Sequence, residues 1–326
     1  MIDVFGTLGP ACDDETILRE MFGSGMTGIR INLSHVMLKD CIDSIDKIHN
    51  AAKANGIIPK ILIDMQGPEL RIGRFKEEIH LQEGAETILG EGGIPVCDEV
   101  IEEAEEGDEV LLDDGKILGV VTHTNGGNAT LKILRGGMLI QRKSILVKNK
   151  NICLEAMTSD DIENLTLADE LGITGIMQPF VRSREDLLFV RRALDEQGLK
   201  NIRIYAKIEN LEGVDNLESF MDLADEMIIA RGDLGNSMPL WELPYVQKKI
   251  SNICNEYGKP FMVVTQMLAS MEKSEVPTRA EVSDIYNAVL DGASSVMVTG
   301  ETAIGRNPVE VIRYLHNTAR TACLHK

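Results

Sequence analysis

The sequence predicts an α/β protein: a closed (β/α)8 TIM barrel with a small all-β lid domain inserted after the third strand. Short apolar runs rich in β-branched residues alternate with amphipathic helical stretches along most of the chain, which is the pattern of parallel βα units. Eight such runs can be counted, and the alternation stops for one interval, from about residue 68 to residue 151. These observations predict a barrel over residues 1–67 and 152–326 and a lid over residues 68–151.

Eight apolar runs are the candidate barrel strands. They are Val4 to Thr7, Gly28 to Asn32, Lys60 to Met65, Gly175 to Pro179, Arg203 to Ile208, Met227 to Ala230, Pro260 to Thr265 and Ser295 to Thr299. Helical patterns follow the strands, as at residues 187–197 and 243–257. Eight units of this kind favour a closed barrel, with an open doubly wound sheet as the alternative.

The interval between the third and fourth strands lacks a long helical period. Turn signals such as Gly92-Gly93, Asp113-Asp114-Gly115 and Asn125-Gly126-Gly127 separate short β-like segments there. Its first half is densely acidic and its end is basic. We interpret the acidic run as a solvated face of a small all-β domain.

Composition limits the possible partners. The 326 residues are 44 % hydrophobic, enough to bury a large core, and the formal net charge of -19 argues against nucleic acid as a partner. No apolar stretch approaches the roughly 20 residues that cross a bilayer, and no signal sequence opens the chain. The six cysteines stand apart, without a Cys-x-x-Cys pair. We expect a cytoplasmic protein with buried or incidental thiols and no membrane partner.

Polar residues gather at the predicted ends of the fifth to seventh strands, where barrel enzymes place their active groups. Lys207 and Glu209 are two residues apart, so both side chains point into the barrel mouth. Glu209 and Asp233 come from neighbouring strands and can share one Mg²⁺. Gly232 lets a substrate approach the backbone, and Thr265 ends a strand in the same mouth. The alternative interpretation is an internal ion pair between Lys207 and Glu209.

The second and third strands end in a further polar set. Arg30, Asn32 and Ser34 alternate onto one side of the chain. Four oxygen donors there can hold a monovalent cation: Asn32, Ser34, Asp64 and the Met65 carbonyl. Arg30 and Arg71 can grip phosphate, because a guanidinium pairs well with phosphate oxygens. Ordinary loop capping is the alternative interpretation of this set.

Several familiar catalytic signatures are missing. The sequence contains neither a Gly-x-x-x-x-Gly-Lys-Ser/Thr loop nor a Gly-x-Gly-x-x-Gly turn after a strand, which disfavours a P-loop kinase and a Rossmann dehydrogenase. It also lacks a Gly-x-Ser-x-Gly elbow, so Ser/His/Asp catalysis finds no support.

Ten segments in sequence order carry a resemblance to the pyruvate kinase family that extends over the whole chain. They are Gly6-Thr7-Leu8-Gly9-Pro10-Ala11, Arg30-Ile31-Asn32-Leu33-Ser34-His35, Asp64-Met65-Gln66-Gly67-Pro68-Glu69, Asp113-Asp114-Gly115, Phe180-Val181-Arg182, Lys207-Ile208-Glu209-Asn210, Ala230-Arg231-Gly232-Asp233-Leu234-Gly235, Thr265-Gln266-Met267-Leu268, Pro277-Thr278-Arg279-Ala280-Glu281 and Gly300-Glu301-Thr302-Ala303.

The resemblance implies a glycolytic activity, phosphoryl transfer from phosphoenolpyruvate to ADP to give pyruvate and ATP, with Mg²⁺ or Mn²⁺ and with K⁺. It makes Lys207 the cation at the transferring phosphoryl group, which fits a reaction that needs mainly alignment and positive charge. Thr265 is then linked to protonation of the enolate.

The resemblance also implies ligand sets. Glu209 and Asp233 would hold Mg²⁺, while Asn32, Ser34, Asp64 and the Met65 carbonyl would hold K⁺, with Glu69 the family's sign of potassium dependence. The substrate contacts would be Arg30, Lys207, Gly232, Asp233 and Thr265. The nucleotide contacts would be Asn32, His35, Arg71 and, from the lid, Lys143.

Two alternatives to the kinase stay open, and departures from the family pattern support one of them. Family members usually have Thr-Lys at Met65-Gln66, Ser at Pro179 and a different lid hinge at residues 144–149. These changes allow a degenerate phosphoenolpyruvate-binding paralogue without kinase activity. A metal-dependent oxo-acid lyase or decarboxylase is the other alternative, although Arg71 and Lys143 favour a nucleotide.

The family's C-terminal effector domain has no counterpart before residue 326. We therefore expect hyperbolic saturation by phosphoenolpyruvate, indifference to sugar phosphates, and a monomer or homodimer rather than a tetramer.

Overall fold

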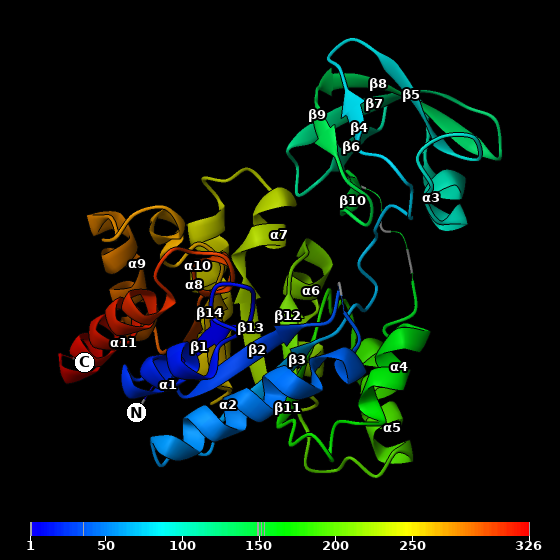
Figure 1. Cartoon of the computed structure of the whole chain (residues 1–326). Coiled ribbons are helices and arrows are strands. Elements are labelled where there is room, and N and C mark those ends of the chain that lie inside the picture. Colours follow the sequence, from blue (N-terminus) through cyan, green and yellow to red (C-terminus); the bar gives the residue numbers. More distant parts are fainter. Residues whose placement is uncertain (1, 35, 149, 151, 153, 326) are drawn as a thin grey trace. The chain divides into compact units, whose positions relative to one another are not determined.

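The computed structural model describes residues 2–34, 36–148, 150, 152 and 154–325 (Figure 1). Contacts divide the chain into two compact units, residues 1–67 with 156–326 and residues 68–155. The sequence-based prediction placed the second boundary at 151/152. Among the described helices, none has the length and apolar character needed to cross a membrane.

The first unit is a closed barrel of eight parallel strands, which confirms the predicted (β/α)8 fold. The strands follow one another around it in the order β1-β15-β14-β13-β12-β11-β3-β2. Their bounds are β1 Asp3–Thr7, β2 Gly28–Asn32, β3 Lys60–Asp64, β11 Gly175–Gln178, β12 Arg203–Ile208, β13 Glu226–Ala230, β14 Phe261–Val264 and β15 Ser295–Met297. Pairing of Asp3 with Ser295 and of Phe5 with Met297 closes the barrel.

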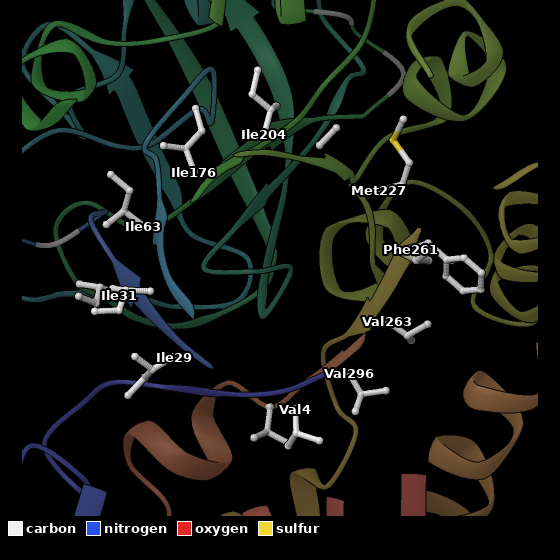
Figure 2. Close-up of a cluster of buried hydrophobic side chains, with 14 of the residues drawn as sticks. Val4, Ile29, Ile31, Ile63, Ile176, Ile204, Met227, Phe261, Val263 and Val296 are labelled. Atoms are coloured by element: carbon white, nitrogen blue, oxygen red, sulfur yellow. The ribbon is translucent and has the colours of Figure 1, made fainter. Parts of the chain in front are cut away.

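Alternate residues of these strands belong to two separate apolar clusters. One cluster lies inside the barrel and includes Phe5, Tyr205 and Met262. The other contains their chain neighbours Val4 and Ile204, and it packs against the helices (Figure 2). Because side chains alternate across a strand, the apolar runs of the sequence fill both layers.

Helices follow the barrel strands, as predicted. The α-helices of this unit are α1 Glu15–Gly23, α2 Ile42–Ala54, α4 Ser159–Leu165, α5 Arg184–Glu196, α6 Leu211–Asp215, α7 Arg231–Asn236, α8 Leu243–Glu256, α9 Arg279–Leu290, α10 Gly300–Ala303 and α11 Pro308–Leu324. Short 3₁₀ turns occur at Leu38–Cys41, Leu217–Phe220 and Ala269–Glu272.

The second unit holds two antiparallel sheets, of order β10-β6-β7-β8-β5 and β4-β9. Their strands are β4 Ile79–Leu81, β5 Glu86–Gly90, β6 Glu109–Leu112, β7 Ile117–Thr124, β8 Asn128–Arg135, β9 Gly137–Leu139 and β10 Ile145–Val147. The prediction of an all-β domain needs one correction, since helix α3, Asp98–Glu103, starts the acidic stretch. Val100 and Ile101 anchor this helix in the unit's own core.

A buried polar cluster lies at the opposite end of the barrel from the strands' carboxyl ends. The Glu226 carboxylate, at the start of β13, accepts hydrogen bonds from the hydroxyls of Ser294, at 2.9 Å, and Ser295. Arg203 lies 3.7 Å from its other oxygen. Burial raises the pKa of Glu226 above its usual 4.5, and the serine hydroxyls and Arg203 offset only part of this effect.

Candidate active site at the barrel mouth

The carboxyl ends of the barrel strands bring the predicted barrel residues together. Pairing of β12 with β13 sets Ile208 beside Ile229, so Glu209 follows one strand where α7, with Gly232 and Asp233, follows its neighbour. Asn32 and Asp64 are paired residues at the ends of β2 and β3. Motifs that are far apart in the sequence thus lie next to one another at the carboxyl end of the barrel.

Lys207 is the centre of a buried ion network. Its Nζ lies 3.2 Å from Asp64 Oδ1 and 3.1 Å from Glu209 Oε1. Arg30 reaches the same Asp64 carboxylate, with Nη2 at 2.6 Å and Nε at 2.8 Å from Oδ2. The side chains of Asp64 and Glu209 are each only 3 % exposed. The ion pair considered as the alternative for Lys207 and Glu209 is therefore present, but within a larger network that also contains Arg30.

Neighbouring charges outweigh burial in setting the pKa values of Asp64 and Lys207. Burial alone would raise the pKa of Asp64, but the charges of Lys207 and Arg30 hold that pKa below its ordinary 3.8. Burial would likewise lower the pKa of Lys207, but Asp64, Glu209 and, more weakly, Asp233 hold it above its ordinary 10.5. Lys207 is consequently a permanent cation at neutral pH.

The donor set fits a divalent ion that keeps part of its shell for water and substrate. Three carboxylates, those of Asp64, Glu209 and Asp233, lie near enough to Lys207 to act on its charge, as does the cation Arg30. Among the described residues no cluster of three His, Cys, Asp or Glu side chains could hold a metal ion alone. Mg²⁺ commonly binds one or two carboxylates plus substrate oxygens, so a two-carboxylate set suits it.

The orientation of Glu209 is fixed from the neighbouring strand. Its Oε2 accepts a hydrogen bond of 2.9 Å from the N–H of Phe180, which follows β11. Phe180 takes a left-handed backbone conformation with a φ of 47°. One carboxylate oxygen thus faces a backbone donor and the other faces Lys207, so the plane of the carboxylate is defined.

The predicted monovalent-cation donors lie close together along two paired strand ends. The Asn32 side-chain oxygen accepts a 3.2 Å hydrogen bond from the N–H of Ser34, which is buried. Met65 follows Asp64 directly and its N–H donates to the Met177 carbonyl at 3.1 Å. These groups offer several neutral oxygens and one carboxylate, a suitable donor chemistry for a hard monovalent ion.

Thr265 lies against Gly232. A side chain at Gly232 would place its Cβ 3.2 Å from Thr265 Cγ2, so glycine allows the start of α7 and the end of β14 to approach closely. Thr265 and Gln266 both adopt left-handed backbone conformations, with φ of 77° and 55°. The chain leaves the barrel at this point, which explains why β14 ends one residue before the predicted Thr265.

The predicted lid contacts are engaged within the second unit. Arg71 Nη2 lies 2.6 Å from Glu69 Oε2, and its Nη1 donates to the Arg142 carbonyl at 2.8 Å. Lys143 Nζ lies 2.8 Å from Asp113 Oδ1. His35, the remaining predicted nucleotide contact, lies outside the described residues.

Two further residues near the mouth were not identified from the sequence. One is Arg231, which donates to the carbonyl of Thr265, the residue that follows β14. The other is Asp161, a fully buried residue of α4, which accepts hydrogen bonds from the N–H groups of Gln66, at 2.7 Å, and Gly67, at 2.8 Å. The capping-box pattern Thr158-x-x-Asp161 was visible in the sequence, but its long-range partners were not.

Gln66, one of the departures from the family pattern, makes two side-chain contacts. Its side-chain amide donates to the Leu33 carbonyl at 3.2 Å and lies 3.4 Å from an oxygen of Asp160. The neutral amide thus connects the loop after β2 with the start of α4. Gly67 packs against Pro179, a second departure from that pattern. The Pro179 ring leaves no room for a Cβ at Gly67.

Comparison with known proteins gives consistent matches over nearly the whole chain. The family model "Pyruvate kinase, barrel domain" matches residues 1–312. A pyruvate kinase of Mycobacterium intracellulare is 37 % identical over 320 residues, which are 94 % of this chain and 67 % of that protein. That of Bacillus licheniformis is 36 % identical, over 96 % of this chain and 55 % of that protein. That of Clostridium perfringens is 35 % identical, over 97 % and 69 %.

Proposed function

We propose that this chain, which belongs to the pyruvate kinase family, transfers the phosphoryl group of phosphoenolpyruvate to ADP, giving pyruvate and ATP. The observation that carries the proposal is Lys207, a buried ammonium held between Asp64 and Glu209 at the barrel mouth. A fixed cation of this kind stabilises the charge of a phosphoryl group in transit without any reorganisation.

The substrate phosphate is proposed to bind between Arg30 and Lys207. Both side chains already share Asp64, so their positions are defined before substrate arrives. Arg30 presents a planar guanidinium, which suits phosphate oxygens, while Lys207 presents a point charge. The backbone at Gly232 and the Thr265 hydroxyl complete the proposed substrate contacts.

Glu209 and Asp233 are proposed to hold Mg²⁺ or Mn²⁺, and Asn32, Ser34, Asp64 and the Met65 carbonyl to hold K⁺. Bound there, the ions would supply additional positive charge to the phosphoryl oxygens. The fixed orientation of Glu209 supports this role, since both its oxygens have defined neighbours.

The enolate left after transfer must gain a proton at carbon. Thr265 is the proposed group near that carbon, because its side chain lies against Gly232 at the mouth. We propose that its hydroxyl orients the proton donor. Lys207 is not assigned as that donor, because Asp64 and Glu209 raise its pKa and so make it a weaker acid.

The proposed nucleotide contacts are Asn32, which belongs to the first unit, and Arg71 and Lys143, which belong to the second unit. In this structure Arg71 pairs with Glu69 and Lys143 with Asp113. Nucleotide phosphates would therefore have to share Arg71 and Lys143 with these carboxylates, or replace the carboxylates as their partners. Arg71 keeps a defined orientation through the Arg142 carbonyl.

A second candidate function is phosphoenolpyruvate binding without transfer. The neutral Gln66 amide at the mouth favours it, since family members usually carry a lysine there. A metal-dependent oxo-acid decarboxylase stays the third possibility, because it would use the same divalent ion and enolate.

A lactate-dehydrogenase-coupled assay with phosphoenolpyruvate, ADP, Mg²⁺ and K⁺ tests the proposal. Pyruvate formation that requires ADP is the expected result. Calorimetric binding of phosphoenolpyruvate without turnover would indicate the binding protein instead. Loss of oxaloacetate with release of CO₂, and no ADP-dependent pyruvate, would indicate the decarboxylase.

A further inference from the structure

The exit of β14 contains an unusual backbone segment. Thr265 and Gln266 are consecutive non-glycine residues with left-handed φ values. A β-branched residue such as threonine rarely adopts this region, because its side chain crowds the backbone. Such residues persist only where the surrounding structure holds them in place, and they concentrate at functional sites.

The group that holds this segment is the guanidinium of Arg231. Its Nη2 and Nε donate to the Thr265 carbonyl at 2.7 Å and 3.2 Å, and Nε also lies 3.3 Å from the Val264 carbonyl. Arg231 is the first residue of α7, immediately before Gly232. The strand exit is thus fixed from the same short helix that carries the proposed substrate and metal residues.

Arg231 is itself fixed from the opposite side by Asp284 of α9. Its Nη1 lies 2.7 Å from Asp284 Oδ2 and 2.9 Å from Oδ1. The Arg231 side chain is only 12 % exposed. A planar guanidinium can serve two carbonyls and a carboxylate at once, whereas a lysine ammonium cannot reproduce this geometry.

We infer that Arg231, supported by Asp284, is a positioning residue: through the Thr265 carbonyl it fixes where the Thr265 side chain lies beside Gly232. The inference rests on the proposed function for its catalytic consequence. Its structural content, that Arg231 maintains the left-handed conformation of Thr265, is independent of that function.

The test compares Arg231→Lys and Asp284→Asn with Arg191→Lys as a matched control. Arg191, on α5, also donates to a main-chain carbonyl, that of Leu223, and lies 3.5 Å from a carboxylate, that of Asp225. Arg231→Lys should lower kcat by up to about 10²-fold, since a small misplacement of a reacting group has effects of this size. KM for ADP should stay within about twofold, and Arg191→Lys should behave as the unsubstituted chain.

Two further readouts separate positioning from a general loss of structure. Exchange of the methyl hydrogens of pyruvate in D₂O, followed by NMR, should slow in Arg231→Lys in parallel with kcat. Adding Gln266→Gly, which relieves the strain of a left-handed side chain, should restore part of the activity of Arg231→Lys. If Arg231 only contributes to stability, kcat and the exchange rate per folded molecule should both stay unchanged in Arg231→Lys.

Crystal structures of the variants test the inference even if the chain has no kinase activity. We expect Thr265 in Arg231→Lys to leave the left-handed region. An unchanged φ at Thr265 would overturn the inference, and so would a shifted Thr265 with normal kcat in an active chain. If the unsubstituted chain transfers no phosphoryl group, the proposed function fails, and the variant structures alone decide the role of Arg231.

Discussion

Lys207 Nζ and Glu209 Oε1 are 3.1 Å apart at the barrel mouth, and neither residue has freedom to turn away. Glu209 is fixed through the Phe180 N–H, and Lys207 is fixed through Asp64. Their ion pair is therefore a rigid part of the site at which we propose that a phosphate and a hydrated ion bind. We therefore expect substitutions of different residues in this network to affect different properties: metal-ion affinity, turnover or stability.

Replacing Lys207 by Met should lower kcat by at least about 10²-fold, because the lost cation acts on charge that develops in the transition state. The fold should persist, because Arg30 continues to pair with Asp64. Affinity for phosphoenolpyruvate should fall much less than kcat. Coupled kinetics and calorimetry on the same preparation measure the two effects.

Lys60→Met is the matched control for this variant. Lys60 begins β3 at the other end of the barrel and forms an ion pair with Asp3. This variant should keep its kcat. Near-normal turnover in Lys207→Met, or an equal loss in Lys60→Met, would contradict the role assigned to Lys207.

Asp233→Asn and Glu209→Gln should each raise the Mg²⁺ or Mn²⁺ concentration needed for half-maximal activity. Each removes one of the two proposed anionic ligands of an ion that dehydrates reluctantly. Titration of Mn²⁺ binding by electron paramagnetic resonance measures the effect without turnover. Unchanged metal affinity in both variants would leave these carboxylates with a purely structural role.

Asp64→Asn should destabilise the protein at neutral pH by about 3–5 kcal/mol, because it leaves Lys207 and Arg30 buried without their shared carboxylate. The pKa of Asp64 is lowered in the folded state, so its contribution is present above its unfolded pKa of 3.8. That contribution is lost as pH falls through the folded pKa. Urea unfolding should therefore show the difference between variant and parent shrinking in strong acid. A constant difference would disprove the linkage.

Glu226→Gln should have the opposite pH dependence. Because the pKa of Glu226 is raised in the folded state, stability falls as pH rises from the usual 4.5 through the folded pKa. The uncharged glutamine removes this loss and can still accept from Ser294 and Ser295. The variant should gain stability relative to its parent as pH rises across this window, with kcat unchanged. Parallel stability curves for the two proteins would argue against a buried, titrating Glu226.

The barrel could be predicted because the pattern that marks each strand lies within a few consecutive residues. Each strand is a short apolar run, and β2 and β12 have the predicted bounds. Helix α3 was missed because only Val100 and Ile101 give it a buried face, within a strongly acidic stretch. A six-residue helix has no room for a clear period.

The predicted residues of the barrel mouth were recognisable because they fall at strand ends in family-like motifs. The contacts of Arg231 with Asp284, and of Asp161 with Gln66, join residues 53 and 95 positions apart. Nothing in either local sequence specifies such partners. The assigned roles of Lys207, Glu209 and Asp233 stay predictions until they are measured.

The pairing of β1 with β15 determines when the barrel can be completed during synthesis. Asp3 leaves the ribosome before its partner Ser295, and six other barrel strands are made between the two. Until then both edges of the growing sheet expose unpaired backbone groups, which can pair with other chains. Nascent chains that stop before residue 295 should therefore be protease-sensitive and should depend on chaperones to avoid aggregation.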